Sequence, residues 1–140
     1  MWIVAGPDMT NPKRMSVRTS ELQCAVIDEF RRVPPRDDAD RGLWLELLKT
    51  VRSLAANSAE SAGAQSRQDF IQKFHICLKE GRECLQLLTA LLHASPGRTI
   101  QLQKLWHSCD QIVAILVSSL KTAKANEDAD KRERRRNPRS

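Results

Sequence analysis

Apolar residues recur through the middle of the chain with a spacing that predicts one long amphipathic helix. Between positions 66 and 92 they alternate in steps of four and three, which is the heptad seam of packed helices. A second apolar row, repeating every seven residues, runs beside this seam. The combined stripe needs neighbours on two sides, which favours a helical bundle over a two-stranded coiled coil. The seam consists of Phe70, Phe74, Cys77, Gly81, Cys84, Leu88 and Leu91, and the second row of Ile71, Leu78, Leu85 and Leu92.

The segment before this helix carries the signals of a turn. Ser66 is a favourable N-cap, and Asp69 three residues later approximates a capping box. Gly63 is a natural stop for a preceding helix. Asn57 and Glu60 share a face near that stop, where a carboxylate is unfavourable unless it has a partner. We therefore expect Asn57 and Glu60 to lock the turn onto the start of the next helix, with a ligand-binding or catalytic role as the alternative.

Gly81 is an exception within the seam. Glycine in a helix costs about 1 kcal/mol relative to alanine. Because Gly81 sits among apolar seam positions, we expect it to permit the close approach of a neighbouring helix.

The same spacing predicts three further helices. Pro34 and Pro35 end the first of them, and either Asp38 or Asp40 is expected to cap the second. Four amphipathic helices with short links predict an all-α, up-down-up-down antiparallel four-helix bundle across residues 17–125. The expected ranges of these three helices are 17–32, 41–62 and 99–125.

Both ends of the chain lack apolar periodicity. Residues 1–16 are expected to form a disordered arm, in which Met15 offers an alternative start of the protein. Residues 126–140 are expected to form a disordered basic tail. The net charge of +6 is concentrated in residues 131–140, which hold six basic side chains and one acidic side chain.

The basic tail is the strongest nucleic-acid signal in the sequence. Flexible arginine-rich segments bind phosphates without sequence specificity and in a salt-dependent way. A tail that only increases solubility is the alternative, and a basic surface of the bundle is a second place to look. The tail candidates are Lys131, Arg132, Arg134, Arg135, Arg136 and Arg139, and the surface candidates are Arg52, Arg67, Lys73 and Arg82.

The spacing of the other reactive side chains argues against a catalytic or metal site. Glu80 and Glu83 share a helical face, but the charged run around them is more typical of a structural or interface role, with Glu83 the better candidate for burial. Cys77 and Cys84 lie two turns apart, too far to share one zinc ion on a straight helix. No glycine-rich phosphate loop and no serine elbow is found. We therefore expect no metal, no cofactor and no enzymatic activity.

The four cysteines are expected to be reduced, in a cytoplasmic protein. All of them fall within helical patterns, and the apolar residues at 2–5 are too few for the core of a signal peptide. No segment approaches the 18 apolar residues of a membrane span. An extracellular disulfide framework is the alternative that the count of cysteines permits.

The central run resembles the four-helix bundle proteins first associated with intervening sequences in 23S ribosomal RNA genes. The resemblance rests on Asn57, Glu60, Ser66 and Phe70, followed by the segment ICLKEGRE at 76–83, with no gap across the stretch. The chain departs from that pattern at Ser61, where glycine is frequent, and at Cys77 and Gly81, where alanine is common. These departures put packing detail in doubt.

The resemblance implies a small all-α bundle in ring-like homo-oligomers, typically pentamers, without established enzymatic activity. A related accessory protein of diversity-generating retroelements forms a similar basic pentamer that binds nucleic acid and a reverse transcriptase. The leading hypothesis is therefore a non-enzymatic, oligomeric accessory protein associated with RNA or DNA, with a protein such as a reverse transcriptase as a further partner. The alternative is a helical scaffold that binds a protein and no nucleic acid.

Overall fold

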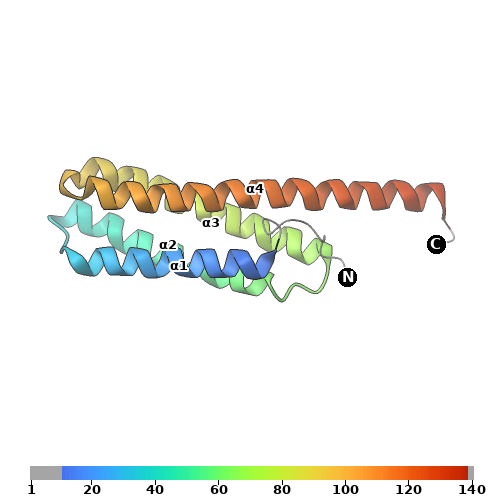
Figure 1. Ribbon diagram of the computed structural model, residues 1–140, viewed down its shortest axis with the longest axis horizontal. Helices are drawn as coiled ribbons and strands as arrows, with labels where there is room; N and C mark the ends of the chain where they lie inside the picture. The colour runs from blue at the N-terminus through green and yellow to red at the C-terminus, as the bar shows by residue number, and fades with distance from the viewer. Residues whose placement is uncertain (1–10, 139–140) are drawn as a thin grey trace.

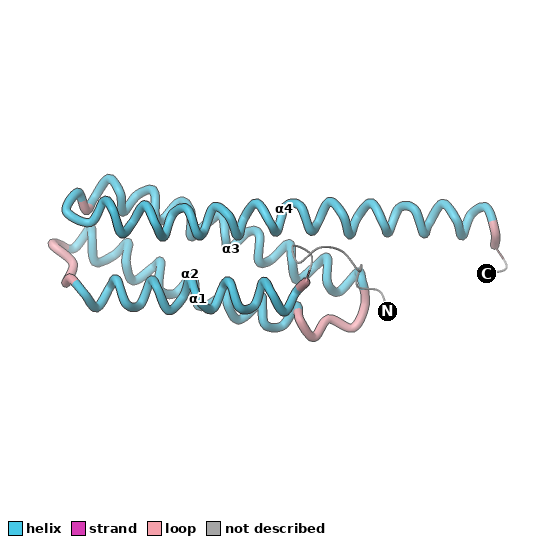
Figure 2. The backbone as a smooth tube through the Cα atoms, in the orientation of Figure 1, coloured by secondary structure: helices cyan, strands magenta, loops and turns pink. Residues whose placement is uncertain are grey.

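The computed structural model describes residues 11–138, and within this range they form four α-helices, one short 3-10 helix and no strand (Figure 2). The all-α class predicted from the sequence is thus confirmed. The elements are α1 (Pro12–Arg32), α2 (Asp38–Ser61), α3 (Arg67–Ala94), η2 (Pro96–Arg98) and α4 (Thr99–Arg136).

The four helices lie side by side, and successive helices are joined at alternate ends of the molecule (Figure 1). Helix α1 packs on α2, α2 on α3 and α3 on α4, whereas α1 and α4 share the least extensive contact. Helix α4 has 38 residues against 28 in α3, and its C-terminal part continues past the other helices. The structure therefore has one end closed by short loops and another end from which α4 projects.

The core is built from the apolar faces that the sequence predicts. Every seam residue of α3 is buried, including the glycine, and α3 packs against both α2 and α4. In the flanking row Leu78 is buried, and the other three members are half-buried against the core. The largest fully buried side chains include Met15, Trp44, Leu54, Phe74, Leu88 and Leu116.

Helix α1 begins earlier than expected, so the predicted disordered arm is wrong for its last residues. Asn11 is the N-cap, and its side chain accepts a hydrogen bond of 3.0 Å from the backbone N–H of Lys13. Pro12 occupies the first helical turn, where its missing N–H is harmless. Met15 extends the apolar face and is buried. The expectation for residues 1–10 lies outside the described residues.

The cap of α2 also differs from the expectation. Asp37, and not Asp38 or Asp40, is the N-cap, and its Oδ1 accepts a hydrogen bond of 2.9 Å from the N–H of Asp40. Asp40 itself is buried and makes other contacts. An aspartate caps α2, as the sequence predicts. Because three aspartates lie within four positions, the sequence alone does not indicate which of them is the cap.

The expected disordered tail is wrong for residues 126–136, which continue α4 as a helix. Glu127 and Lys131 form an i,i+4 ion pair of 3.2 Å in the orientation that favours a helix. Three arginines in the last turn suit the negative end of the helix dipole. Arg67 of α3 also forms an ion pair with Asp130. Local pairing and one tertiary contact thus order a segment that has no apolar face.

Candidate functional site

The C-terminal part of α4 carries five exposed basic residues within six positions, 131–136. Residues 131–138 are all exposed, and residues 131–136 add about 9 Å of helix beyond Asp130 at 1.5 Å per residue. We call five side chains the basic end of α4, and the sixth tail candidate, Arg139, lies outside the described residues. The basic end consists of Lys131, Arg132, Arg134, Arg135 and Arg136.

Few of these charges are neutralised by the protein itself. Lys131 pairs with Glu127 at 3.2 Å, and it is the one member of the basic end for which the described residues provide an ion pair. Helical spacing distributes the five side chains over a broad arc, so that Arg132 and Arg136 lie opposite Arg134. A polyanion therefore meets cations over much of the helix circumference.

A notch separates the basic end of α4 from the start of α3. It has a volume of about 310 Å³, and we call it the α3–α4 notch. Arg67 donates a hydrogen bond from Nη1 to Asp130 beside it, while the Nε of Arg67 is buried without a hydrogen-bond partner. The notch thus combines charges from two helices. Its lining is Ser66, Arg67, Gln68, Glu127, Lys131 and Arg134.

The turn motif forms in part as predicted. Ser66 accepts a hydrogen bond of 3.1 Å from the N–H of Asp69, and Asp69 accepts one of 3.1 Å from the N–H of Gln65. This arrangement confirms Ser66 as the cap of α3. Phe70 is buried and its ring lies 4.2 Å from that of Phe74, centroid to centroid. These contacts fix the start of α3 against the core.

The predicted lock by Asn57 and Glu60 is absent from the described residues. The side-chain amide of Asn57 donates to the carbonyl of Ser53, one turn earlier in α2, at 2.9 Å. Glu60 is exposed, and only its backbone carbonyl takes part in the turn, as the acceptor for the N–H of Gly63 at 3.0 Å. The turn is therefore held by backbone hydrogen bonds and by the cap of α3.

The two glutamates of α3 and the surface candidates do not converge on one site. Glu80 and Glu83 are both half-buried, so the expected preference of Glu83 for burial is not seen. Burial, reinforced by the nearby charge of Glu83, raises the pKa of Glu80. Lys73 is paired with Asp69 at 3.0 Å, so it is engaged within α3. Arg52 and Arg82 are exposed on different helices.

Sequence reasoning missed a buried polar cluster at the closed end of the molecule. Arg98 is 5% exposed, donates a hydrogen bond of 3.1 Å to the carbonyl of Glu29 and lies 4.9 Å above the ring of Trp44. Asp40 is 1% exposed and accepts a hydrogen bond of 2.5 Å from the hydroxyl of Ser95. The cluster joins three segments that are distant in sequence, and no local spacing pattern marks it.

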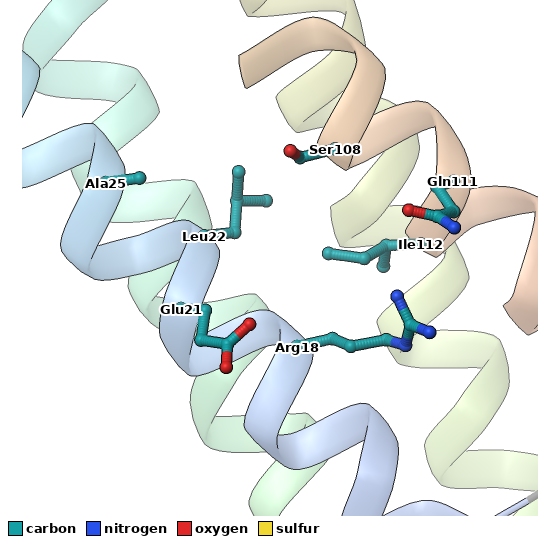
Figure 3. A pocket seen from close by; sticks show the side chains of 7 residues that line it. All are labelled: Arg18, Glu21, Leu22, Ala25, Ser108, Gln111 and Ile112. Carbon is teal, nitrogen blue, oxygen red and sulfur yellow. The ribbon is translucent and has the colours of Figure 1, made fainter. Parts of the chain in front are cut away.

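A groove between α1 and α4 was also not predicted. It has a volume of about 280 Å³, and we call it the α1–α4 groove. Figure 3 shows Leu22 and Ile112 pointing into the space from opposite helices, with Arg18 extending from α1 toward α4. Ser108 and Gln111 contribute polar groups from α4. The groove exists because α1 and α4 pack less closely than the other neighbouring helices.

Neither a metal-ion site nor a membrane-spanning helix is found within residues 11–138. In this range no group of three or more histidine, cysteine, aspartate and glutamate side chains is arranged to hold a metal ion. None of the helices in this range combines the length and the apolar character that crossing a membrane requires. The candidate sites are the basic end of α4, the α3–α4 notch and the α1–α4 groove.

The fold and these sites define a class: an all-helical protein with a basic helix that projects from one end. Comparisons with protein-family models, with curated proteins and with solved structures find no match for this chain.

Proposed function

We infer that this chain is a small non-enzymatic protein that binds RNA or DNA through the basic end of α4. In this proposal the four helices act as an up-down-up-down antiparallel bundle, and the bundle serves to hold the basic helix away from its surface. The observation that carries the proposal is the position of five exposed cations on an ordered helix. Four unpaired cysteines, three of them buried, support a location in the reducing cytoplasm.

The physical basis of binding is the release of counterions from phosphates. Each basic side chain that neutralises a phosphate of single-stranded nucleic acid makes the slope of log affinity against log salt more negative by about 0.7. Five such contacts give a slope of about −3.5. An ordered helix loses less conformational entropy on binding than a disordered tail, because its backbone is already fixed.

Assembly into a homo-oligomer would strengthen this binding. The resemblance described above implies a pentamer, and a ring of five chains would bring five basic helices into one region. The binding of one helix would then raise the effective concentration of phosphate at the others. Multi-angle light scattering on the purified protein measures the assembly: a mass of five chains supports the pentamer, and a mass of 15.9 kDa contradicts it.

The central test measures fluorescence anisotropy of labelled single-stranded RNA at several salt concentrations. The test variant replaces Arg132, Arg135 and Arg136 by glutamine, a good helix former that preserves α4. We expect its affinity to fall at low salt and its salt slope to become shallower by about 2, since three contacts are removed. No binding by the wild type at low salt would contradict the proposed function.

A matched control removes the same charge from the bundle surface. Arg41, Lys49 and Arg52 are exposed on α2, and their replacement by glutamine also lowers the net charge by three. We expect this control to bind nearly as well as the wild type. If the control loses as much affinity as the test variant, the interface is not confined to α4.

The α1–α4 groove favours a second candidate function, the docking of a protein. Its apolar floor is flanked by polar groups, and the neighbouring face of α1 exposes Val17 to 56%. A scaffold of this kind would bind its partner with little dependence on salt, because apolar burial is not screened by ions. The salt slope therefore separates this candidate from nucleic-acid binding.

A further inference from the structure

The inward side of α4 changes character where α4 leaves the bundle. Ile112, Leu116 and Ala123 are buried along this side, and Glu127 and Asp130 follow at the next helical turns. This buried stripe thus becomes charged beside Arg67, at the start of α3. The α3–α4 notch lies where this buried apolar stripe ends, and its lining is polar.

The notch holds more cationic than anionic groups, and its ion pairs leave donors unused. Arg67, Lys131 and Arg134 supply three positive charges, against the carboxylates of Glu127 and the adjoining Asp130. Arg134 has no ion pair among the described residues. The Nε of Arg67 is buried without a hydrogen-bond partner, although buried donors of this kind are normally satisfied by protein, water or an ion.

We propose that the α3–α4 notch is a phosphate seat in which Arg67, Lys131 and Arg134 hold one phosphodiester group of the nucleic-acid backbone. This inference rests on the proposed function and assigns one contact of that interaction to a defined place. A phosphate oxygen takes the position of Glu127 at Lys131, Arg134 supplies a second cation, and the guanidinium of Arg67 supplies a third. Asp130 continues to accept the hydrogen bond from Nη1 of Arg67, and this bond fixes the position of the guanidinium.

The seat has an internal competitor, and this competitor gives a specific test. Glu127 lines the notch and forms an ion pair of 3.2 Å with Lys131, so its negative charge repels an incoming phosphate. Glu133 lies outside the lining, six residues along the same helix. We expect Glu127→Gln to tighten binding of single-stranded RNA about fivefold, the effect of removing a unit charge about 4 Å away in water. We expect Glu133→Gln to tighten it less than about twofold.

A second pair of variants tests the cationic side in the same anisotropy measurement. Arg134→Gln removes a charge from the notch, and Arg132→Gln removes the same charge from the opposite face of α4. If the phosphate seat exists, Arg134→Gln lowers the affinity for RNA more than Arg132→Gln does. If each variant of a pair changes the affinity equally, the phosphate seat is wrong, while the basic end of α4 remains a nucleic-acid interface.

An independent measurement uses inorganic phosphate alone and does not require RNA. In a nitrogen–proton NMR titration of the full chain, the Nε–H signals of Arg67 and Arg134 are expected to shift more than that of Arg132. A uniform drift of the three signals would overturn the seat. Differential shifts with no RNA binding by the wild type would instead support an anion site and contradict the proposed function.

Discussion

Arg67, in the first turn of α3, donates a hydrogen bond from Nη1 to the Oδ2 of Asp130, 63 positions later in α4. This ion pair joins the start of one helix to the projecting part of another. Among the ion pairs of the described residues, it is the tertiary pair that lies nearest to the basic end of α4. The order of the projecting helix therefore depends on a residue outside it.

Replacing Asp130 by asparagine is expected to loosen the end of α4 without unfolding the rest of the protein. The two side chains are 22% and 44% exposed, so solvent screening limits the loss of global stability to about 0.5 kcal/mol. Amide hydrogen exchange should become faster in residues 127–136 and stay unchanged in α2. Asp128→Asn, at an exposed position without a tertiary ion pair, is the control; equal acceleration in both variants would contradict this role of Asp130.

Asp40 is expected to make the protein less stable in acid. Burial opposes its ionisation, but the hydrogen bonds from Ser95 and from the N–H of Arg36, together with the charge of Arg98, lower its pKa below the ordinary value. A lowered native pKa means that the stabilisation is present above the unfolded pKa of about 3.9 and is lost as the pH falls through the native pKa.

The variant Asp40→Asn removes this dependence. We expect it to lower the free energy of unfolding by about 2 kcal/mol at neutral pH, because it weakens charged hydrogen bonds in a buried site. Below about pH 4 the difference between variant and wild type should narrow. Denaturant titrations of both proteins at several pH values measure this difference in the free energy of unfolding. A difference that stays constant down to pH 2 would show that the charge of Asp40 does not contribute.

Gly81 lets α4 approach α3 closely, as the sequence predicted. A Cβ at this position would lie 3.2 Å from Cγ2 of Val113 and 3.8 Å from Cδ1 of Leu116, and the thiol of Cys109 donates to the Gly81 carbonyl at 3.4 Å. In Gly81→Ala the crowding against Val113 offsets a gain of about 1 kcal/mol in helix propensity.

The balance at Gly81 is testable with a double-mutant cycle. We expect Gly81→Ala to change the free energy of unfolding by less than about 1 kcal/mol, and to be more favourable in a Val113→Ala background, where the crowding is relieved. Gly81→Leu should be strongly destabilising in either background, because the space is too small for its side chain. If the effects of Gly81→Ala and Val113→Ala on the free energy of unfolding are strictly additive, Val113 does not crowd a side chain at position 81.

The cysteines are expected to differ sharply in reactivity. Cys24 is exposed, whereas Cys77, Cys84 and Cys109 are buried. Burial, with a smaller contribution from the charge of Glu80, raises the pKa of Cys77 to about 12, and the neighbouring Cys109 together with burial raises the pKa of Cys84. The thiols of Cys77 and Cys84 stay protonated at pH 8, and the thiolate is the reactive form.

Titration of the native protein with a thiol reagent at pH 8 should therefore modify one cysteine per chain. The other three should react only after denaturant is added. Cys24→Ser removes the fast reaction and serves as the control. Rapid modification of a second thiol in the native Cys24→Ser protein would show that the core opens readily.

Glu60→Ala is expected to leave the melting temperature within about 2 °C of the wild-type value, because Glu60 is exposed and its side chain does not hold the turn. Ser66→Ala gives the comparison, since the loss of a helix cap costs about 1 kcal/mol and should lower the melting temperature by about 3 °C. A larger loss for Glu60→Ala than for Ser66→Ala would restore the predicted lock by Asn57 and Glu60.

Most of the fold was predictable, and less of the candidate site. The basic residues of the α4 end were identified from composition, but their helical conformation was not. Apolar periodicity was the guide to helix length, and Glu127 and Asp130 carry no such signal; their pairing with Lys131 and Arg67 orders the segment instead. The notch and the α1–α4 groove depend on how two helices lie relative to each other, which no single periodic pattern encodes.

The sequence by itself determined the helices, the apolar faces and the cap at Ser66, because these depend on spacing within one or two helical turns. The tertiary structure alone decided which polar groups that are distant in sequence become partners. Asp40 meets Ser95, and Arg67 meets Asp130, only because four helices bring their ends together. Apolar burial is non-directional and follows composition, whereas an ion pair or hydrogen bond requires two particular atoms within a few ångströms.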